Sequence, residues 1–110
     1  MKLIIEIDEE SYLKSYLSIL TIGMLDCIEK GIITFDDTAQ LLFSPGMMET
    51  FKAFPNISEY IHLGTELEDV ASIIPHKLLD SIDDIREQCH KEIQFNKDHK
   101  QHIKYRVNVK

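Results

Sequence analysis

Residues 11–30 read "SYLKSYLSILTIGMLDCIEK", and this stretch decides the fold class. Large apolar side chains recur along it at spacings of three and four: Leu13, Leu17, Leu20, Met24 and Ile28. That spacing is the period of one face of an α-helix. Further apolar residues widen the face almost all the way round, which predicts a central helix. Lys30 and Gly31 predict its end, because a cation suits the last turn and glycine accepts positive φ just beyond it.

A second long helix is predicted over residues 75–95. Its apolar side chains follow a 4-3-4-4 spacing: Leu78, Ile82, Ile85, Cys89 and Ile93. A separate face of the same helix carries the acidic residues Asp80, Asp83, Asp84 and Glu87. The two long helices should therefore pack on one another through their apolar stripes.

The residues between the long helices predict short helices, each with its own start signal. The signals are Thr34, Ser44 before Pro45, the pair Asn56 and Glu59, and the pair Thr65 and Glu68. The last pair lies in "HLGTELEDVASIIP", residues 62–75, where it has capping-box spacing. Glu66, Glu68 and Asp69 are then interpreted as the first turn of a helix, where the dipole favours negative charge, rather than as catalytic or metal-binding groups.

Both ends of the chain carry strand patterns. Residues 2–8, "KLIIEID", alternate apolar and polar side chains, and so do residues 103–109. An isolated strand is unstable, so we expect the two to pair, either within one chain or between two chains of a homodimer. The predicted fold is mainly α or α+β, with residues 1–110 forming a single domain.

Composition excludes several classes of protein. The chain has 110 residues and a formal net charge of −7, which opposes binding to nucleic acid or to an anionic membrane surface. Its most apolar run, residues 16–25, is shorter than the roughly 20 residues of a membrane span. The first ten residues do not form a signal peptide. We therefore expect a cytoplasmic protein whose cysteines, Cys27 and Cys89, are reduced.

Catalytic chemistry has little support in the sequence. Cys27 and Cys89 fall on predicted apolar faces, where thiols are usually inert, and no phosphate-binding or dinucleotide-binding glycine motif is present. No cofactor is expected. His99 and His102 form the alternative: if helical, they could face one metal ion, with Cys89 and His90 upstream, and if extended they would point apart. The alternative function is thus a small enzyme or metal-dependent protein that uses this His-rich segment.

Recognition of another protein is the favoured interpretation. Asp80 and Asp84, like Asp83 and Glu87, place equal charges four residues apart on a helix, which is mildly unfavourable. The acidic face is either ordinary solvated surface or a contact for a basic partner. A second group is predicted to lie in the core, although it would form an adaptable apolar surface if exposed: Phe43, Met47, Met48, Phe51 and Phe54.

The runs "SYLSILTIGMLDCIEKGIITFDDTAQLLFSP" and "IHLGTELEDVASIIP" resemble a family of small bacterial proteins of unknown function. The resemblance covers residues 12–85 and carries no catalytic or ligand residue with it. In general character alone, the chain is similar to immunity proteins that neutralise toxins. We therefore predict a non-catalytic, immunity- or regulator-like protein-binding module that uses its acidic helical surface.

Overall fold

A computed structural model of the chain describes residues 1–98 and 106–109. The elements, in chain order, are β1 (Leu3–Glu6), α1 (Glu10–Glu29), α2 (Phe35–Leu41), α3 (Pro45–Thr50), α4 (Pro55–Thr65), α5 (Leu67–Ile73), the 3₁₀ helix η1 (Pro75–Lys77), α6 (Leu78–Asp98) and β2 (Arg106–Val109). The mainly helical, α+β class predicted from the sequence is confirmed. Both long helices lie within three residues of their predicted bounds.

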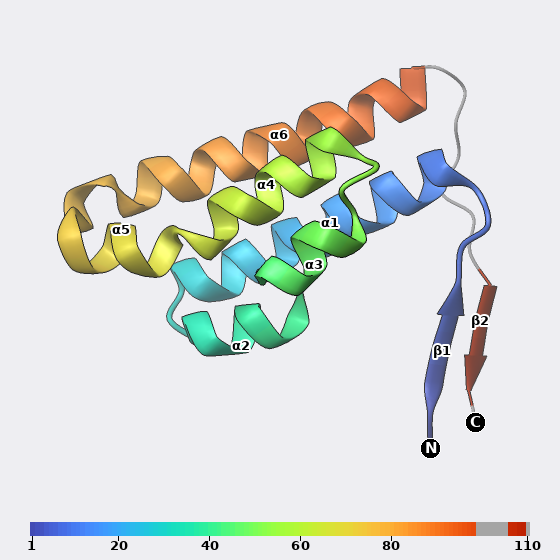
Figure 1. The fold of residues 1–110 in the computed structure, drawn as a ribbon, viewed down its shortest axis with the longest axis horizontal. Helices are drawn as coiled ribbons and strands as arrows, with labels where there is room; N and C mark the ends of the chain where they lie inside the picture. The colour runs from blue at the N-terminus through green and yellow to red at the C-terminus, as the bar shows by residue number, and fades with distance from the viewer. Residues whose placement is uncertain (99–105, 110) are drawn as a thin grey trace.

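The helical body is built on α1 and α6, which run antiparallel with α4 beside them (Figure 1). At one end of this pair, the Asn96 side-chain amide donates to the Ser15 hydroxyl at 2.8 Å and to the Ser11 carbonyl at 3.2 Å. Toward the other end, Arg86 of α6 contacts the Glu29 carboxylate of α1 at 2.7 Å. The hydrogen bonds of Asn96 and the ion pair of Arg86 thus join α1 and α6 near both ends and fix the register of the two helices.

The core lies where α1, α4, α5 and α6 meet. Its fully buried aliphatic side chains are Leu25, Ile57, Ile61, Leu67, Ile82 and Ile85. The apolar face predicted for α1 is only partly correct, because Leu20 is 50% exposed whereas Ser18 and Thr21 are buried. Thr21 can be buried there because its hydroxyl donates to the Leu17 carbonyl at 2.8 Å.

Two of the predicted helix starts are confirmed. The Thr34 hydroxyl accepts from the Asp37 amide at 3.1 Å, and the Asp37 carboxylate accepts from the Thr34 amide at 2.9 Å, so α2 begins with a reciprocal capping box. The Ser44 hydroxyl caps α3 by accepting from the Met47 amide at 3.2 Å. Gly31 has a φ of 70°, as predicted for the residue that follows the first long helix.

The predicted starts at Asn56 and Thr65 are wrong. Helix α4 begins at Pro55 and continues through Gly64 to Thr65, whose hydroxyl donates back to the His62 carbonyl at 2.6 Å. The physical reason is packing: Gly64 is buried against the Phe43 ring, so it belongs to the α4 contact surface and does not end a helix. Helix α5 follows after Glu66 without a side-chain cap.

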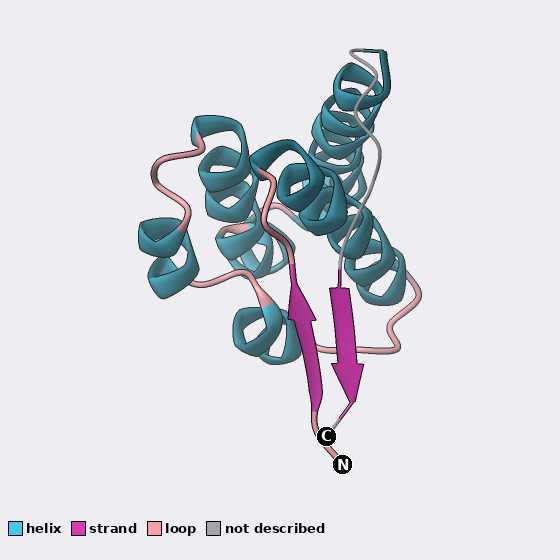
Figure 2. Cartoon of the chain, turned by 90° about the vertical axis from the view of Figure 1, so that its right-hand side faces the viewer, coloured by secondary structure: helices cyan, strands magenta, loops and turns pink. Residues whose placement is uncertain are grey.

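The terminal strands pair within one chain. β1 and β2 form a two-stranded antiparallel sheet in which Leu3 faces Val109 and Glu6 faces Arg106. This sheet projects from the helical body, with β1 and β2 side by side (Figures 1 and 2). None of the described helices combines the length and the apolar character needed to cross a membrane.

Candidate functional site

The acidic face of α6 is exposed at each of its four predicted residues, Asp80, Asp83, Asp84 and Glu87. Two of them have partners. Asp83 pairs with Arg86, which also binds Glu29, and Glu87 lies 3.3 Å from the Lys91 ammonium. Asp80 and Asp84 form no ion pair with any side chain of residues 1–98. Asp83 and Glu87 therefore take part in ion pairs within the chain. Asp80 and Asp84 face solvent.

The alternative metal site cannot be placed, since His99 and His102 lie outside the described residues. Within the described part of the chain, no group of three or more His, Cys, Asp or Glu side chains could hold a metal ion. The upstream residues Cys89 and His90 diverge: Cys89 is fully buried and His90 is exposed.

Both cysteines are free thiols, as predicted. Burial, and to a smaller extent the negative charge of the neighbouring Glu92 carboxylate, raises the pKa of the Cys89 thiol to about 12. Cys89 is therefore protonated at neutral pH and unsuited to act as a nucleophile. Cys27 is partly buried and lines an apolar groove between α1 and α2.

An apolar groove runs between α1 and α2 and has a volume of about 520 Å³. Its lining residues are Leu17, Ile19, Leu20, Gly23, Met24, Cys27, Ile33, Leu41 and Leu42. Among them Ile19, Leu20 and Leu41 are 44%, 50% and 62% exposed. We call this surface the α1–α2 groove. The predicted Phe and Met cluster, in contrast, packs against or within the core.

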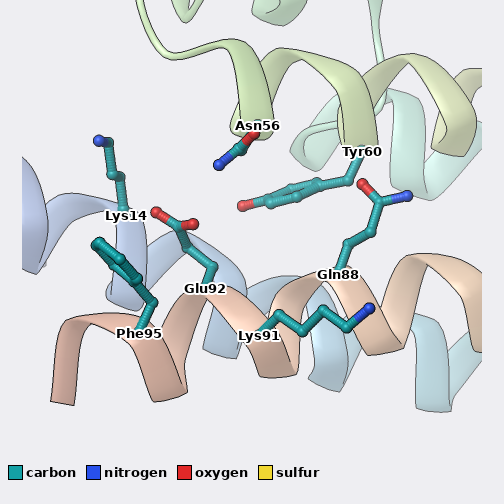
Figure 3. A pocket seen from close by; sticks show the side chains of 7 residues that line it. All are labelled: Lys14, Asn56, Tyr60, Gln88, Lys91, Glu92 and Phe95. Atoms are coloured by element: carbon teal, nitrogen blue, oxygen red, sulfur yellow. The ribbon is translucent and has the colours of Figure 1, made fainter. Parts of the chain in front are cut away.

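A second, more polar pocket of about 400 Å³ lies where α1, α4 and α6 meet (Figure 3). Its lining residues are Lys14, Asn56, Tyr60, Gln88, Lys91, Glu92 and Phe95. Tyr60 projects from α4 toward Glu92 of α6 (Figure 3). We call this the polar pocket.

Sequence reasoning missed both cavities for different reasons. The polar pocket joins side chains from three helices that are far apart in the chain, so no local spacing reveals it. The groove was hidden because α1 is apolar almost all round, and periodicity alone does not tell which side of such a helix stays uncovered. Its one available signal was the excess of apolar residues, such as Ile19 and Cys27, beyond those of the single stripe predicted for this helix.

The fold and its surfaces define a small, mainly helical protein that exposes an apolar groove. The chain belongs to the family described as "Protein of unknown function (DUF3969)", whose sequence profile matches residues 8–108. No curated protein and no solved structure matches the chain.

Proposed function

We propose that the protein is a non-catalytic, stoichiometric protein-binding module of the immunity or regulator kind, acting in the cytosol. The observation that carries this proposal is the α1–α2 groove. A monomeric protein gains stability by covering large aliphatic side chains, yet Ile19, Leu20 and Leu41 line one continuous hollow and remain exposed. Contiguous apolar surface of this kind is typical of sites that contact another protein.

Gly23 supports the same interpretation. It lies inside α1, where glycine costs about 1 kcal/mol relative to alanine. A Cβ added at Gly23 would meet nothing within 4 Å, so no contact inside the chain requires glycine there. Because Gly23 lines the groove, its missing side chain would let the backbone of a bound segment approach α1 closely.

The occupant that fits best is an amphipathic helix of a partner protein, with an apolar face and basic flanks. A groove between two helices accepts the apolar face of a third in a common mode of recognition. Helix α2, which forms one wall, carries Asp36 and Asp37 and no basic residue. The net charge of −7 favours a partner with a basic surface. The solvent-facing carboxylates of Asp80 and Asp84 would add to the long-range attraction of such a partner.

The test compares capture by groove variants with capture by a matched surface variant. Leu20→Glu places a charge in the groove on an exposed helical position, whereas Ile73→Glu makes the same kind of change at a 77% exposed residue that does not line the groove. We expect wild type and Ile73→Glu to retain one partner from lysate, and Leu20→Glu to lose it. The retained protein, once purified, should bind wild type with one-to-one stoichiometry in calorimetry.

Two results would contradict the proposal. One is identical capture by wild type and Leu20→Glu. The other is a retained protein that the chain modifies chemically rather than binds.

The acidic face of α6 is tested separately. Asp80→Asn with Asp84→Asn removes the two charges that form no ion pair within residues 1–98, while Asp83 and Glu87 keep their contacts. Association with the purified basic partner should become slower and less dependent on salt, with little change in dissociation. An unchanged association rate would assign these acids to ordinary surface.

A further inference from the structure

Helix α2 lies at the edge of the helical body and is held there loosely (Figure 1). Five of its seven residues are exposed, and its buried residue, Thr38, donates its hydroxyl to the Phe35 carbonyl of α2 itself at 2.7 Å. Within residues 1–98, no side chain of α2 forms a hydrogen bond or an ion pair with another helix. Helix α4 packs closely on α3 and α6, whereas no helix or strand of the described residues packs along α2 in that way.

Apolar side chains anchor both ends of α2. On the N-terminal side, Ile33 and Phe35 are partly buried and pack against the core. On the C-terminal side, Leu42 and Phe43 are buried in the core itself. Between these anchors, the α1–α2 groove separates α2 from α1. A helix that is anchored at its two ends can roll about the line that joins them, because a roll keeps its own backbone hydrogen bonds.

The two walls of the groove offer apolar surface that such a roll would bring together. Leu41 is the residue within α2 that lines the groove, and it is 62% exposed. On the α1 wall, Gly23 has no side chain, and a Cβ at its position would meet no atom within 4 Å. Leu41 therefore does not cover Gly23 in the described structure, although the hydrophobic effect favours burying an exposed leucine on an apolar wall.

We propose that α2 is a lid that closes the α1–α2 groove when no partner is bound. In the closed form, α2 rolls toward α1 and Leu41 packs over Gly23, in the place that an apolar side chain of the partner takes in the open form. The structure shows the open form, with its groove of about 520 Å³. This inference rests on the proposed function, because the groove that α2 closes is the proposed partner site. Partner binding requires the open form, so the apparent affinity falls with the fraction of chains that are open.

A disulfide between the two walls tests the closed form without any ligand. The variant carries Gly23→Cys and Leu41→Cys together with Cys27→Ser, which removes the native thiol of the groove, while the fully buried Cys89 stays. The Cβ atoms of a disulfide lie about 3.8 Å apart on average. In the open form, no atom of Leu41 lies within 4 Å of a Cβ at Gly23. We expect oxidised glutathione to link the two positions within one chain, as measured by mass spectrometry of the linked peptides.

The matched control pair is Gly23→Cys with Ala39→Cys in the same background. Ala39 is an exposed residue of α2 that does not line the groove. A folded α2 that rolls brings Leu41 to Gly23 and not Ala39, whereas an α2 that unfolds brings either. We expect the Leu41→Cys pair to form its disulfide at least about tenfold faster than the control pair. Equal rates, or no disulfide within either chain, would overturn the proposal.

The neutral apolar dye Nile red tests the competition between the lid and an occupant. Leu41→Ala shortens the side chain that closes the groove, so we expect the affinity for the dye to rise by about threefold or more, because a larger fraction of the chains is open. Leu20→Ala shortens a leucine of the α1 wall, so the affinity should fall with the lost contact surface. If α2 is a rigid wall, both variants lower the affinity, and that result contradicts the proposal.

The disulfide and the capture experiment separate the lid from the proposed function. If the disulfide forms but wild type and Leu20→Glu capture the same proteins, the lid stands and the partner site is wrong. If capture depends on Leu20 but the disulfide does not form, the partner site stands and the lid is wrong.

Discussion

The helical body and the terminal sheet use apolar residues in opposite ways. In the body, Leu25, Ile61 and Ile82 are fully buried where helices from distant parts of the chain meet. In the sheet, Leu3 and Val109 face each other across the strands and are 60% and 61% exposed. Both regions show a clear apolar period in the sequence. The spacing of apolar residues therefore predicts whether a segment forms a helix or a strand. Whether its apolar side is buried depends on a second layer of structure that covers it.

No helix or strand among the described residues forms that second layer on the sheet. A single two-stranded sheet is marginally stable in water, because each strand has one neighbour and neither face is packed. In the body, α6 packs against both α1 and α4, and these two helices also contact each other. We therefore expect the body to account for nearly all of the free energy of unfolding, and the following predictions test this division.

The largest difference should appear between matched leucine truncations. Leu25→Ala removes a fully buried side chain and should lower the free energy of unfolding by about 2–5 kcal/mol, through lost transfer energy and the cavity left behind. Leu3→Ala shortens an exposed side chain in β1 and should change it by less than about 0.5 kcal/mol. Urea denaturation followed by circular dichroism measures both. Equal losses would mean that the sheet is as important to stability as the core.

Gly64 and Gly23 lie on two kinds of helix surface in the body: Gly64 is packed against another side chain, and Gly23 faces open space. A Cβ at Gly64 would lie 2.4 Å from a Phe43 ring atom, so Gly64→Ala should cost about 1–3 kcal/mol through overpacking. Gly23→Ala meets open space and should stabilise the chain by about 0.5–1 kcal/mol through helix propensity. Thermal melts of the two variants should therefore shift in opposite directions. A destabilising Gly23→Ala would argue against an open groove at this position.

Alkaline pH should weaken the body through Cys89. Its thiol has an ordinary pKa of 9.0 and a folded-state pKa of about 12, so the folded chain binds the proton more tightly than the unfolded chain does. This contribution is fully present below pH 9 and is lost as the pH rises toward 12. At pH 10 the loss should be on the order of 1 kcal/mol relative to neutral pH.

The control for this pH dependence is Cys89→Ala, which removes the titrating thiol and should flatten the fall above pH 9. Tyr60, whose pKa is also raised by burial, adds a loss at still higher pH that the variant keeps. If wild type and Cys89→Ala show the same slope between pH 8 and pH 10, the thiol does not contribute.

Substitutions in the terminal sheet should have the smallest effect on the free energy of unfolding. They should also change whether two copies of the chain form a dimer. We propose that two copies associate through the apolar face formed around Leu3 and Ile5, because this would supply the missing layer. Leu3→Lys with Ile5→Lys should convert a concentration-dependent dimer to a monomer in sedimentation experiments. The free energy of unfolding, measured at low concentration, should change by less than about 0.5 kcal/mol. A wild-type chain that is monomeric at every concentration would contradict this proposal.

Local signals predicted much of the fold. The caps at Thr34 and Ser44 and the helix end at Gly31 depend on hydrogen bonds and φ angles within a few residues, so the sequence contains the whole interaction. That the two ends pair was predicted from the instability of either strand alone, whereas the antiparallel direction and the pairing within one chain are shown by the structure.

The failures occurred where tertiary contacts override local patterns. Thr65 has the spacing of a cap, yet α4 continues past it because Gly64 packs on Phe43, a contact across more than one loop. Leu20 shares the period of a buried stripe but faces the groove. The polar pocket depends on the meeting of α1, α4 and α6, which no single segment encodes.

The hydrogen bond between Asn96 and Ser11 has a consequence for the order of folding. Pairing Leu3 with Val109 closes a loop that contains almost the whole chain, and loop closure of this kind is entropically unfavourable and slow. Once α1 and α6 have packed, Asn96 and Ser11 hold the beginning of α1 beside the end of α6. The strands that adjoin these helices then meet at a high effective concentration. The sheet should therefore form last and open first, so its amide hydrogens should exchange with solvent while the helical core stays protected.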